Sequence, residues 1–152
     1  MRTQSNKYKA IFLDRDGVII EDCHYIKNPK DVRLCNGAKE LIRNLYNKNI
    51  LVIIITNQSG ISKGLLSWDD YHEVNNKMIE LLDMPNPIKA IYANSYITDK
   101  PINWRKPNPA MILKALNDFN LNIKKSILIG DRNSDILAGM RANIPKIFHV
   151  ST

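Results

Sequence analysis

Residues 9–17 read Lys-Ala-Ile-Phe-Leu-Asp-Arg-Asp-Gly, an apolar run that ends in charged side chains. The length and character of the apolar part predict a short strand over residues 9–13. Asp14 and Asp16 then lie just beyond the carboxyl end of that strand. In open sheets of parallel strands, ligands bind beyond this end. This stretch therefore indicates both a fold and the place in it where a functional site is expected.

Strand and helix patterns continue to alternate along the rest of the chain. The run Ile-Leu-Val-Ile-Ile-Ile at 50–55 is typical of a strand buried on both faces. Ser67 is a good N-cap for one helix, and Asn108 followed by a proline for another. We expect further strands over 50–55, 88–93, 126–129 and 146–150, and helices over 38–48, 67–82, 109–119 and 134–142.

This alternation predicts an α/β, Rossmann-like, doubly wound fold: a mostly parallel five-stranded sheet with helices on both faces. The 152 residues fit one domain, which we place at 1–152. The segment 17–51 has room for a loop and one helix, and 60–105 for a helix, a strand and a loop. Neither segment can hold a separate lid, so we expect no cap domain.

The composition places few limits on function but does exclude some classes. Hydrophobic residues make up 44% and charged residues 24%, and no apolar stretch approaches the ~20 residues of a membrane span. The net charge of +7 comes from scattered Lys and Arg residues. A scattered charge favours small anionic substrates over nucleic acid.

The two cysteines, Cys23 and Cys35, do not make a disulfide framework. Free thiols in a reducing cytosol are the simpler interpretation, and we expect a cytoplasmic protein. A zinc site that uses both cysteines and His24 is conceivable, but this spacing matches no common pattern.

Polar clusters follow four of the predicted strands. They are Asp-Arg-Asp-Gly at 14–17, Thr-Asn-Gln-Ser-Gly at 56–60, Arg-Lys-Pro at 105–107 and Gly-Asp-Arg-Asn-Ser-Asp at 130–135. Each cluster alone is weak, because acidic pairs often cap helices and short polar runs are often turns. Together they would meet at one edge of the sheet, and structural need alone does not explain that convergence.

This collection of side chains suits phosphoryl chemistry. Asp14, Asp16 and Asp131 offer the oxygen ligands that Mg²⁺ prefers. Lys106 supplies a cation for phosphate oxygens, and the Thr56 hydroxyl can complete a phosphate site. An aspartate beside a metal and a lysine is a recognised nucleophile toward phosphorus. The sequence therefore predicts a phosphatase that acts on a small phosphorylated metabolite.

The four clusters resemble the four motifs of the haloacid dehalogenase-like phosphatases, and the resemblance covers nearly the whole chain. Within that superfamily, the segments 14–17, 56–60 and 105–107 are similar to those of D-glycero-D-manno-heptose 1,7-bisphosphate phosphatases and histidinol-phosphate phosphatases. The resemblance implies an aspartyl-phosphate intermediate, with heptose bisphosphate as the best single substrate and its 7-phosphate as the group removed.

The resemblance also implies residue roles. Asp14 would attack phosphorus, and Asp16 would act as acid and then base. Mg²⁺ would be held by Asp14, the Asp16 carbonyl and Asp131, while Thr56 and Lys106 would bind the transferring phosphoryl group. The substrate contacts would be Arg15, Asp22, Tyr25, Asn57, Gln58, Ser59, Arg105 and Arg132, with Asp135 as an orienting group and His24 a weaker candidate.

The chain departs from this subgroup at two places. The subgroup often carries a zinc loop before Arg-Lys-Pro, but residues 92–104 contain no Cys or His, so we predict no structural zinc. Trp104 is expected to pack where that metal would fix the loop. Relatives usually continue beyond the last strand, which here ends near Val150. The sheet edge there is thinly covered, so we expect a monomer or a weak homodimer.

Four other functions compete with this prediction. Histidinol phosphate is the nearest rival substrate, and a nucleic-acid 3′-phosphatase would suit the positive charge but lacks a basic stripe interleaved with aromatics. A phospho-accepting receiver module also has a strand-end aspartate and a magnesium site. Such a module has no need of Asp16, which therefore favours turnover. A silent binding protein is the last alternative, although every expected catalytic position is filled.

Overall fold

The structure, a computed structural model, describes residues 7–95 and 104–150 of the chain. Five strands form one parallel sheet in the order β3-β2-β1-β4-β5. They are β1 (Ala10–Leu13), β2 (Leu51–Asn57), β3 (Ala90–Asn94), β4 (Ser126–Gly130) and β5 (Lys146–His149). The predicted five-stranded Rossmann-like sheet is confirmed. Its central strand is β1, the strand that precedes the first acidic cluster.

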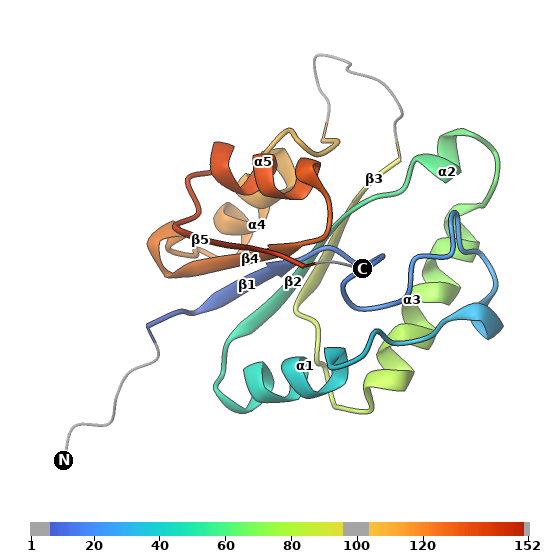
Figure 1. Cartoon of the computed structure of the whole chain (residues 1–152), viewed down its shortest axis with the longest axis horizontal. Helices are drawn as coiled ribbons and strands as arrows, with labels where there is room; N and C mark the ends of the chain where they lie inside the picture. The colour runs from blue at the N-terminus through green and yellow to red at the C-terminus, as the bar shows by residue number, and fades with distance from the viewer. Residues whose placement is uncertain (1–6, 96–103, 151–152) are drawn as a thin grey trace.

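Helices cover both faces of the sheet, as predicted (Figure 1). α1 (Ala38–Asn47) and α3 (Trp68–Leu82) pack on one face, and α4 (Ala110–Asp118) and α5 (Asn133–Arg141) on the other. Successive side chains of a strand point to opposite faces. Accordingly, Ile11 and Leu13 of β1 join the core beneath α1 and α3, whereas Phe12 joins the core beneath α4 and α5.

The helix starts show how local sequence fixes these elements. Ser67 caps α3 through a capping box: its hydroxyl accepts from the Asp70 N–H, and the Asp70 carboxylate accepts from the Ser67 N–H. At α4 the expected N-cap is off by one residue, because Pro109 occupies that position and the helix begins at Ala110. Asn108 still accepts a hydrogen bond from the Ala110 N–H.

Three short elements were not expected from the sequence: α2 (Ser59–Ser62) and the 3₁₀ turns η1 (Pro29–Asp31) and η2 (Ile123–Lys125). Elements of three or four residues are too short to show a hydrophobic period. Among the described residues, only η1 and α1 lie between β1 and β2, and only α2 and α3 between β2 and β3. Neither connection forms a second layered unit over the sheet.

The described part of the chain contains no helix whose length and apolar character would allow it to cross a membrane. Because all five strands are parallel, their carboxyl ends meet at one edge of the sheet. The loops that leave this edge carry the four polar clusters.

Candidate active site

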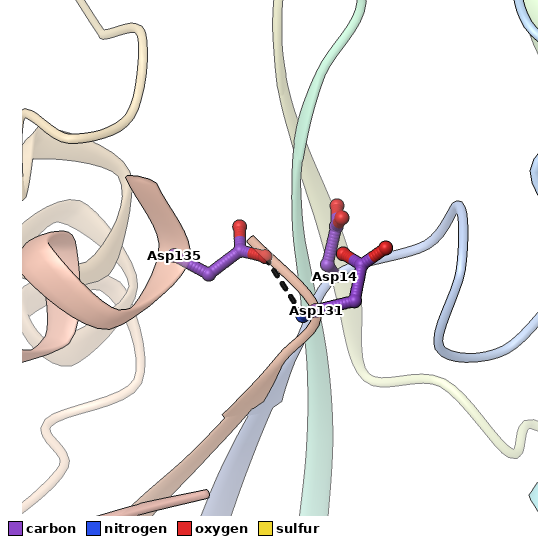
Figure 2. A group of neighbouring side chains, drawn as sticks. All are labelled: Asp14, Asp131 and Asp135. Atoms are coloured by element: carbon purple, nitrogen blue, oxygen red, sulfur yellow. Dashed lines mark hydrogen bonds between the residues drawn. The ribbon is translucent and has the colours of Figure 1, made fainter. Parts of the chain in front are cut away.

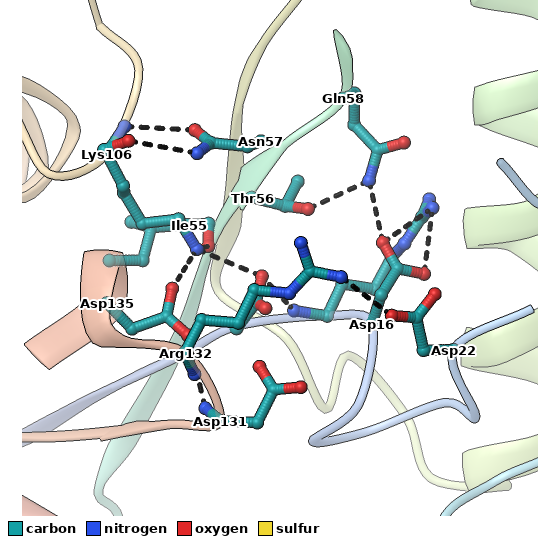
Figure 3. A network of polar contacts seen from close by, with 12 residues as sticks. Asp16, Asp22, Ile55, Thr56, Asn57, Gln58, Lys106, Asp131, Arg132 and Asp135 are labelled. Carbon is teal, nitrogen blue, oxygen red and sulfur yellow. Dashed lines mark hydrogen bonds and ion pairs between the residues drawn. The ribbon is translucent and has the colours of Figure 1, made fainter. Parts of the chain in front are cut away.

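A pocket of about 420 Å³ opens at the carboxyl edge of the sheet. All of the predicted site residues except Thr56 and Asp131 line it. Thr56 lies near the end of β2 and Asp131 directly follows β4, the two strands that flank β1 (Figure 3). The lining residues on which the following description depends are Asp14, Arg15, Asp16, Asp22, Tyr25, Asn57, Gln58, Ser59, Lys63, Arg105, Lys106, Arg132 and Asp135.

Lys106 is a buried cation at the centre of this site, with only 3% of its surface exposed. Its ammonium donates to Asp14 Oδ1 at 3.0 Å, to the Ile55 carbonyl at 2.9 Å and to the Asp135 carboxylate. Burial alone lowers the pKa of this lysine, but the two carboxylates raise it above its ordinary value. The ammonium therefore stays charged and joins the end of β1 and the carboxyl-terminal part of β2 to the first turn of α5.

Asp14 is buried at the end of β1, and its Oδ1 also accepts from the Arg15 N–H at 2.9 Å. Burial raises the pKa of Asp14 to about 7, even though the Lys106 ammonium lowers it. A carboxylate in this position is poorly hydrated, so few water molecules compete with a substrate for its oxygens. These are the conditions under which a carboxylate oxygen is an effective nucleophile once it is ionised.

Three carboxylates form an acidic group beside Lys106. One oxygen each of Asp14, Asp131 and Asp135 lie within 4.8 Å of one another (Figure 2). Burial and the neighbouring Asp135 carboxylate raise the pKa of Asp131. Asp131 Oδ1 is buried and finds no hydrogen-bond partner among the described residues. An unpartnered buried oxygen among carboxylates fits a site for a hard divalent cation.

Asp135 holds the start of α5 in place. Its Oδ2 accepts from the backbone N–H groups of Asp131 and Arg132, both at 3.1 Å. The close approach depends on Gly130, because a Cβ at that position would lie 2.2 Å from the Asp135 Cβ. Asp135 therefore contacts both Lys106 and the Asp131 loop, and its orienting function stays a prediction.

The Asp16 carboxylate lies at one wall of the pocket and is held from two sides. Gln58 Nε2 donates to Asp16 Oδ2 at 2.9 Å and to the Thr56 hydroxyl at 2.8 Å. Arg15 NH2 lies 3.3 Å from both carboxylate oxygens. Thr56 is completely buried behind this contact. Gln58 thus links the end of β2 to the loop after β1.

Arg15 does not lie as expected for a substrate contact. Its side chain is buried, and its NH1 donates to Asn75 Oδ1 on α3 at 2.9 Å. Its Cζ lies 5.5 Å from the centre of the Tyr71 ring. Both terminal nitrogens are engaged by protein groups, although Arg15 is among the residues that line the pocket, so substrate contact by Arg15 stays a prediction.

Asn57 also differs from a simple substrate contact. Its Oδ1 accepts from the Lys106 N–H at 3.0 Å, and its Nδ2 donates to the Lys106 carbonyl at 3.2 Å. This pair of bonds fixes the backbone that carries Lys106. The same side chain lines the pocket, as do Ser59 and Arg105.

The rim of the pocket is built from the loop after β1, which is joined to other loops by exposed side chains. Arg132 NH2 donates to Asp22 Oδ2 at 2.8 Å, and Lys63 Nζ donates to the Tyr25 hydroxyl at 2.6 Å. Although burial raises the pKa of Asp22, the His24 N–H and the Arg132 guanidinium lower it below its ordinary value. Gly60 makes room for the ring of Tyr25, since a Cβ there would lie 2.6 Å from it.

The sequence model of the haloacid dehalogenase-like hydrolase family matches residues 7–149. The chain belongs to this family. Members of this family are hydrolases, which agrees with the hydrolytic chemistry that the sequence motifs indicated for the Asp14–Lys106 pair and the acidic group.

Two relatives of this haloacid dehalogenase-like hydrolase illustrate the similarity. The D-glycero-alpha-D-manno-heptose-1,7-bisphosphate 7-phosphatase of Campylobacter jejuni is 39% identical over 146 residues, which cover 95% of this chain and 84% of that protein. The D-glycero-beta-D-manno-heptose-1,7-bisphosphate 7-phosphatase of Helicobacter pylori is 33% identical over 141 residues, which cover 91% of this chain and 82% of that protein.

A solved structure resembles the hydrolase closely in fold. It is the D,D-heptose 1,7-bisphosphate phosphatase of B. bronchiseptica complexed with magnesium and phosphate, with a TM-score of 0.85 and 27% sequence identity. The similarity covers 92% of this chain and 79% of that chain. Its magnesium and phosphate show that a related fold of this kind accommodates both groups.

Some expectations concern residues at the border of what the structure describes. Most of the segment at 92–104 lies outside the described residues, so the prediction of no structural zinc there stays a prediction. Trp104 is described and packs against the core beneath α4 and α5. Cys23 is exposed and Cys35 half-buried, both as free thiols. Sequence reasoning missed Lys63 and Asn75, because Lys63 follows α2 just beyond the motif at 56–60 and Asn75 lies on α3, which carries no motif.

Proposed function

We propose that this hydrolase is a magnesium-dependent phosphatase that removes the 7-phosphate of D-glycero-D-manno-heptose 1,7-bisphosphate. The observation that carries the proposal is the buried Asp14 carboxylate, paired with the Lys106 ammonium at 3.0 Å and grouped with Asp131. The names of the two relatives identify the substrate class. Because the relatives include both anomeric names, we propose no anomeric preference.

Magnesium would be held by the Asp14 and Asp131 carboxylates and by the Asp16 carbonyl. The unpartnered Asp131 oxygen supports this assignment. When bound, the ion would offset the repulsion between carboxylates and neutralise phosphate charge. A cation beside Asp14 would also lower its pKa from about 7, so that the carboxylate is ionised at neutral pH.

The reaction would proceed in two displacements at phosphorus. Asp14 attacks phosphorus, the bond to the sugar oxygen breaks, and Asp16 gives that oxygen its proton. A water molecule then attacks the aspartyl-phosphate and gives a proton to Asp16, and the bond to Asp14 breaks to release phosphate. The Lys106 ammonium would stabilise charge on the transferring group. The Thr56 hydroxyl accepts from Gln58 and retains its own proton for donation to a phosphate oxygen.

Substrate selection would depend on the rim. Arg105 and Arg132 line the pocket and bring positive charge to it, which suits a substrate with a second phosphate. Asp22 and Tyr25 lie on the loop after β1 and offer hydrogen-bond partners for sugar hydroxyls. Gln58 and Ser59 complete the wall from the end of β2. The pocket is therefore polar and anion-selective, without a lid among the described residues.

The decisive test is phosphate release with Mg²⁺ from a panel of both heptose bisphosphate anomers, histidinol phosphate and a 3′-phosphorylated oligonucleotide. We expect kcat/KM for a heptose bisphosphate to exceed the other classes at least about a hundredfold, or about 2.7 kcal/mol of transition-state free energy. Asp14→Asn should abolish release from every substrate while the protein still unfolds cooperatively. Higher kcat/KM on histidinol phosphate or the oligonucleotide would reassign the substrate.

We also propose that the protein is cytoplasmic and at most weakly dimeric. The free thiols Cys23 and Cys35 suit a reducing compartment. The edge strand β5 is four residues long and begins with the exposed Lys146. Short edges with lysine resist pairing between sheets. Light scattering across a concentration series would detect any dimer.

A further inference from the structure

The Arg15 guanidinium is buried between the loop after β1 and helix α3. Its residue is 0% exposed, although it stands between two acidic residues at the edge of the pocket. On its α3 side, NH1 donates to Asn75 Oδ1 at 2.9 Å, and the Tyr71 ring lies 5.5 Å from Cζ. Its Nε has no hydrogen-bond partner among the described residues.

Burial of this charge lowers the stability of the fold, and the contacts that Arg15 gains offset little of that loss. A buried charge destabilises the fold unless it is paired, and a partly satisfied network is less favourable than an apolar side chain of similar size. The charged partner that the structure gives Arg15 is Asp16, at 3.3 Å. The buried guanidinium lies against that carboxylate.

We infer that Arg15 is a positioning residue, which is anchored by Asn75 and Tyr71 and holds the Asp16 carboxylate in its orientation at the pocket wall. The inference rests on the proposed function, in which Asp16 exchanges protons with the reacting oxygens. A guanidinium is a rigid planar fork, so fixing one nitrogen on α3 also fixes the nitrogen that faces Asp16.

The contacts to Asp16 show why the anchor matters. Gln58 reaches only Oδ2, at 2.9 Å, whereas Arg15 NH2 lies 3.3 Å from both Oδ1 and Oδ2. Gln58 alone would leave the carboxylate free to rotate about that single contact. The Asp16 side chain is 20% exposed, so solvent would compete for the released oxygen. Arg15 therefore supplies the second constraint that fixes the plane of the carboxylate.

The chain offers a matched pair of variants on α3. Asn75 is buried against Arg15, whereas the adjacent Asn76 is exposed. Asn75→Ala removes the anchor and leaves Arg15 and Asp16 in place, and Asn76→Ala applies the same chemical change without touching the site. Arg15→Lys is the third variant, because it keeps the charge but removes the fork.

The assay compares the heptose bisphosphate with p-nitrophenyl phosphate under Mg²⁺. Nitrophenolate leaves phosphorus without needing a proton, so aspartyl-phosphate formation from this probe does not depend on Asp16 as an acid. Hydrolysis of the intermediate still needs Asp16 as a base. With Asn75→Ala and Arg15→Lys, we expect a burst of about one nitrophenolate per site, followed by a steady state about tenfold slower than wild type.

On the bisphosphate, kcat should fall about tenfold for both variants while KM stays within about twofold, and Asn76→Ala should match wild type. Thermal unfolding in the same buffer checks that the variants are folded at the assay temperature. Wild-type kcat and burst kinetics in folded Asn75→Ala and Arg15→Lys would overturn the inference. If wild type hydrolyses p-nitrophenyl phosphate but not the bisphosphate, the proposed substrate fails while the test of Arg15 proceeds on the probe.

Discussion

Replacement of Lys106 by Met tests whether one ammonium holds the acidic centre together. The substitution keeps the approximate length of the side chain but removes the cation that contacts Asp14 and Asp135. Removing one partner of a buried ion pair costs about 3–5 kcal/mol, because the remaining charge is left without compensation. We expect Lys106→Met to lower the free energy of unfolding by that amount at pH 8 in EDTA.

The stability cost of Lys106→Met should also depend on pH. In the metal-free protein the pKa of Asp14 is raised from 3.8 to about 7, a difference that corresponds to about 4 kcal/mol. Protonation of Asp14 therefore contributes stability that is fully present below about pH 4 and is lost as the pH rises through about 7. Without Lys106 that pKa rises further. The cost of Lys106→Met should consequently be smaller at pH 5, where Asp14 is neutral, than at pH 8.

Urea unfolding at pH 5 and pH 8, both in EDTA, measures this difference directly. Lys114→Met is the control, because Lys114 forms an exposed i,i+4 pair with Asp118 and its loss should change stability little at either pH. A Lys106→Met cost that is equal at the two pH values would refute the assignment of the raised pKa to Asp14. A cost below about 1 kcal/mol at pH 8 would refute the argument that the Lys106 ammonium compensates the buried charges of Asp14 and Asp135.

Three further outcomes follow from single contacts. Asp131→Asn should weaken Mg²⁺ binding at least about tenfold by calorimetry, because it neutralises the carboxylate that offers an unpartnered oxygen; unchanged affinity would remove Asp131 from the metal site. Gly60→Ala should raise KM severalfold with a smaller effect on the aspartyl-phosphate burst, since the new Cβ would meet Leu66 at 2.4 Å and Tyr25 at 2.6 Å. Ser67→Ala should cost about 1 kcal/mol in chemical denaturation and leave kcat unchanged, because it removes a helix cap that does not line the pocket.

The sequence predicted the sheet well because its strands have strong, local signals. The β-branched run at 50–55 forms the buried part of β2, and the clusters at 14–17 and 130–135 do lie at strand ends. The Asp14–Lys106 pair could be expected because Asp14 directly follows β1, Lys106 comes at the end of the connection after β3, and parallel strands bring their carboxyl ends together. Their 3.0 Å contact spans 92 positions of sequence.

The features of the site that the sequence did not indicate concern the direction of side chains. Arg15 stands between two site aspartates, so its sequence position suggested the pocket, but its side chain turns toward Asn75. That choice depends on an amide from α3, which is 60 positions away and carries no motif. Lys63 was missed for a related reason: it follows the four-residue α2, which is too short to show a period, and reaches Tyr25 only in the folded chain.

The loop that carries Asp22 and Tyr25 is fastened to the molecule by exposed contacts to Arg132 and Lys63. Exposed pairs of this kind add little to folding stability, so they can be exchanged without endangering the fold. The buried residues beneath this loop, such as Asp14, Lys106 and Asp135, cannot be exchanged in this way, because each of them forms contacts on which another depends. New specificities in this lineage should therefore arise first by substitution at the four exposed positions, with the hydrolytic chemistry inherited unchanged.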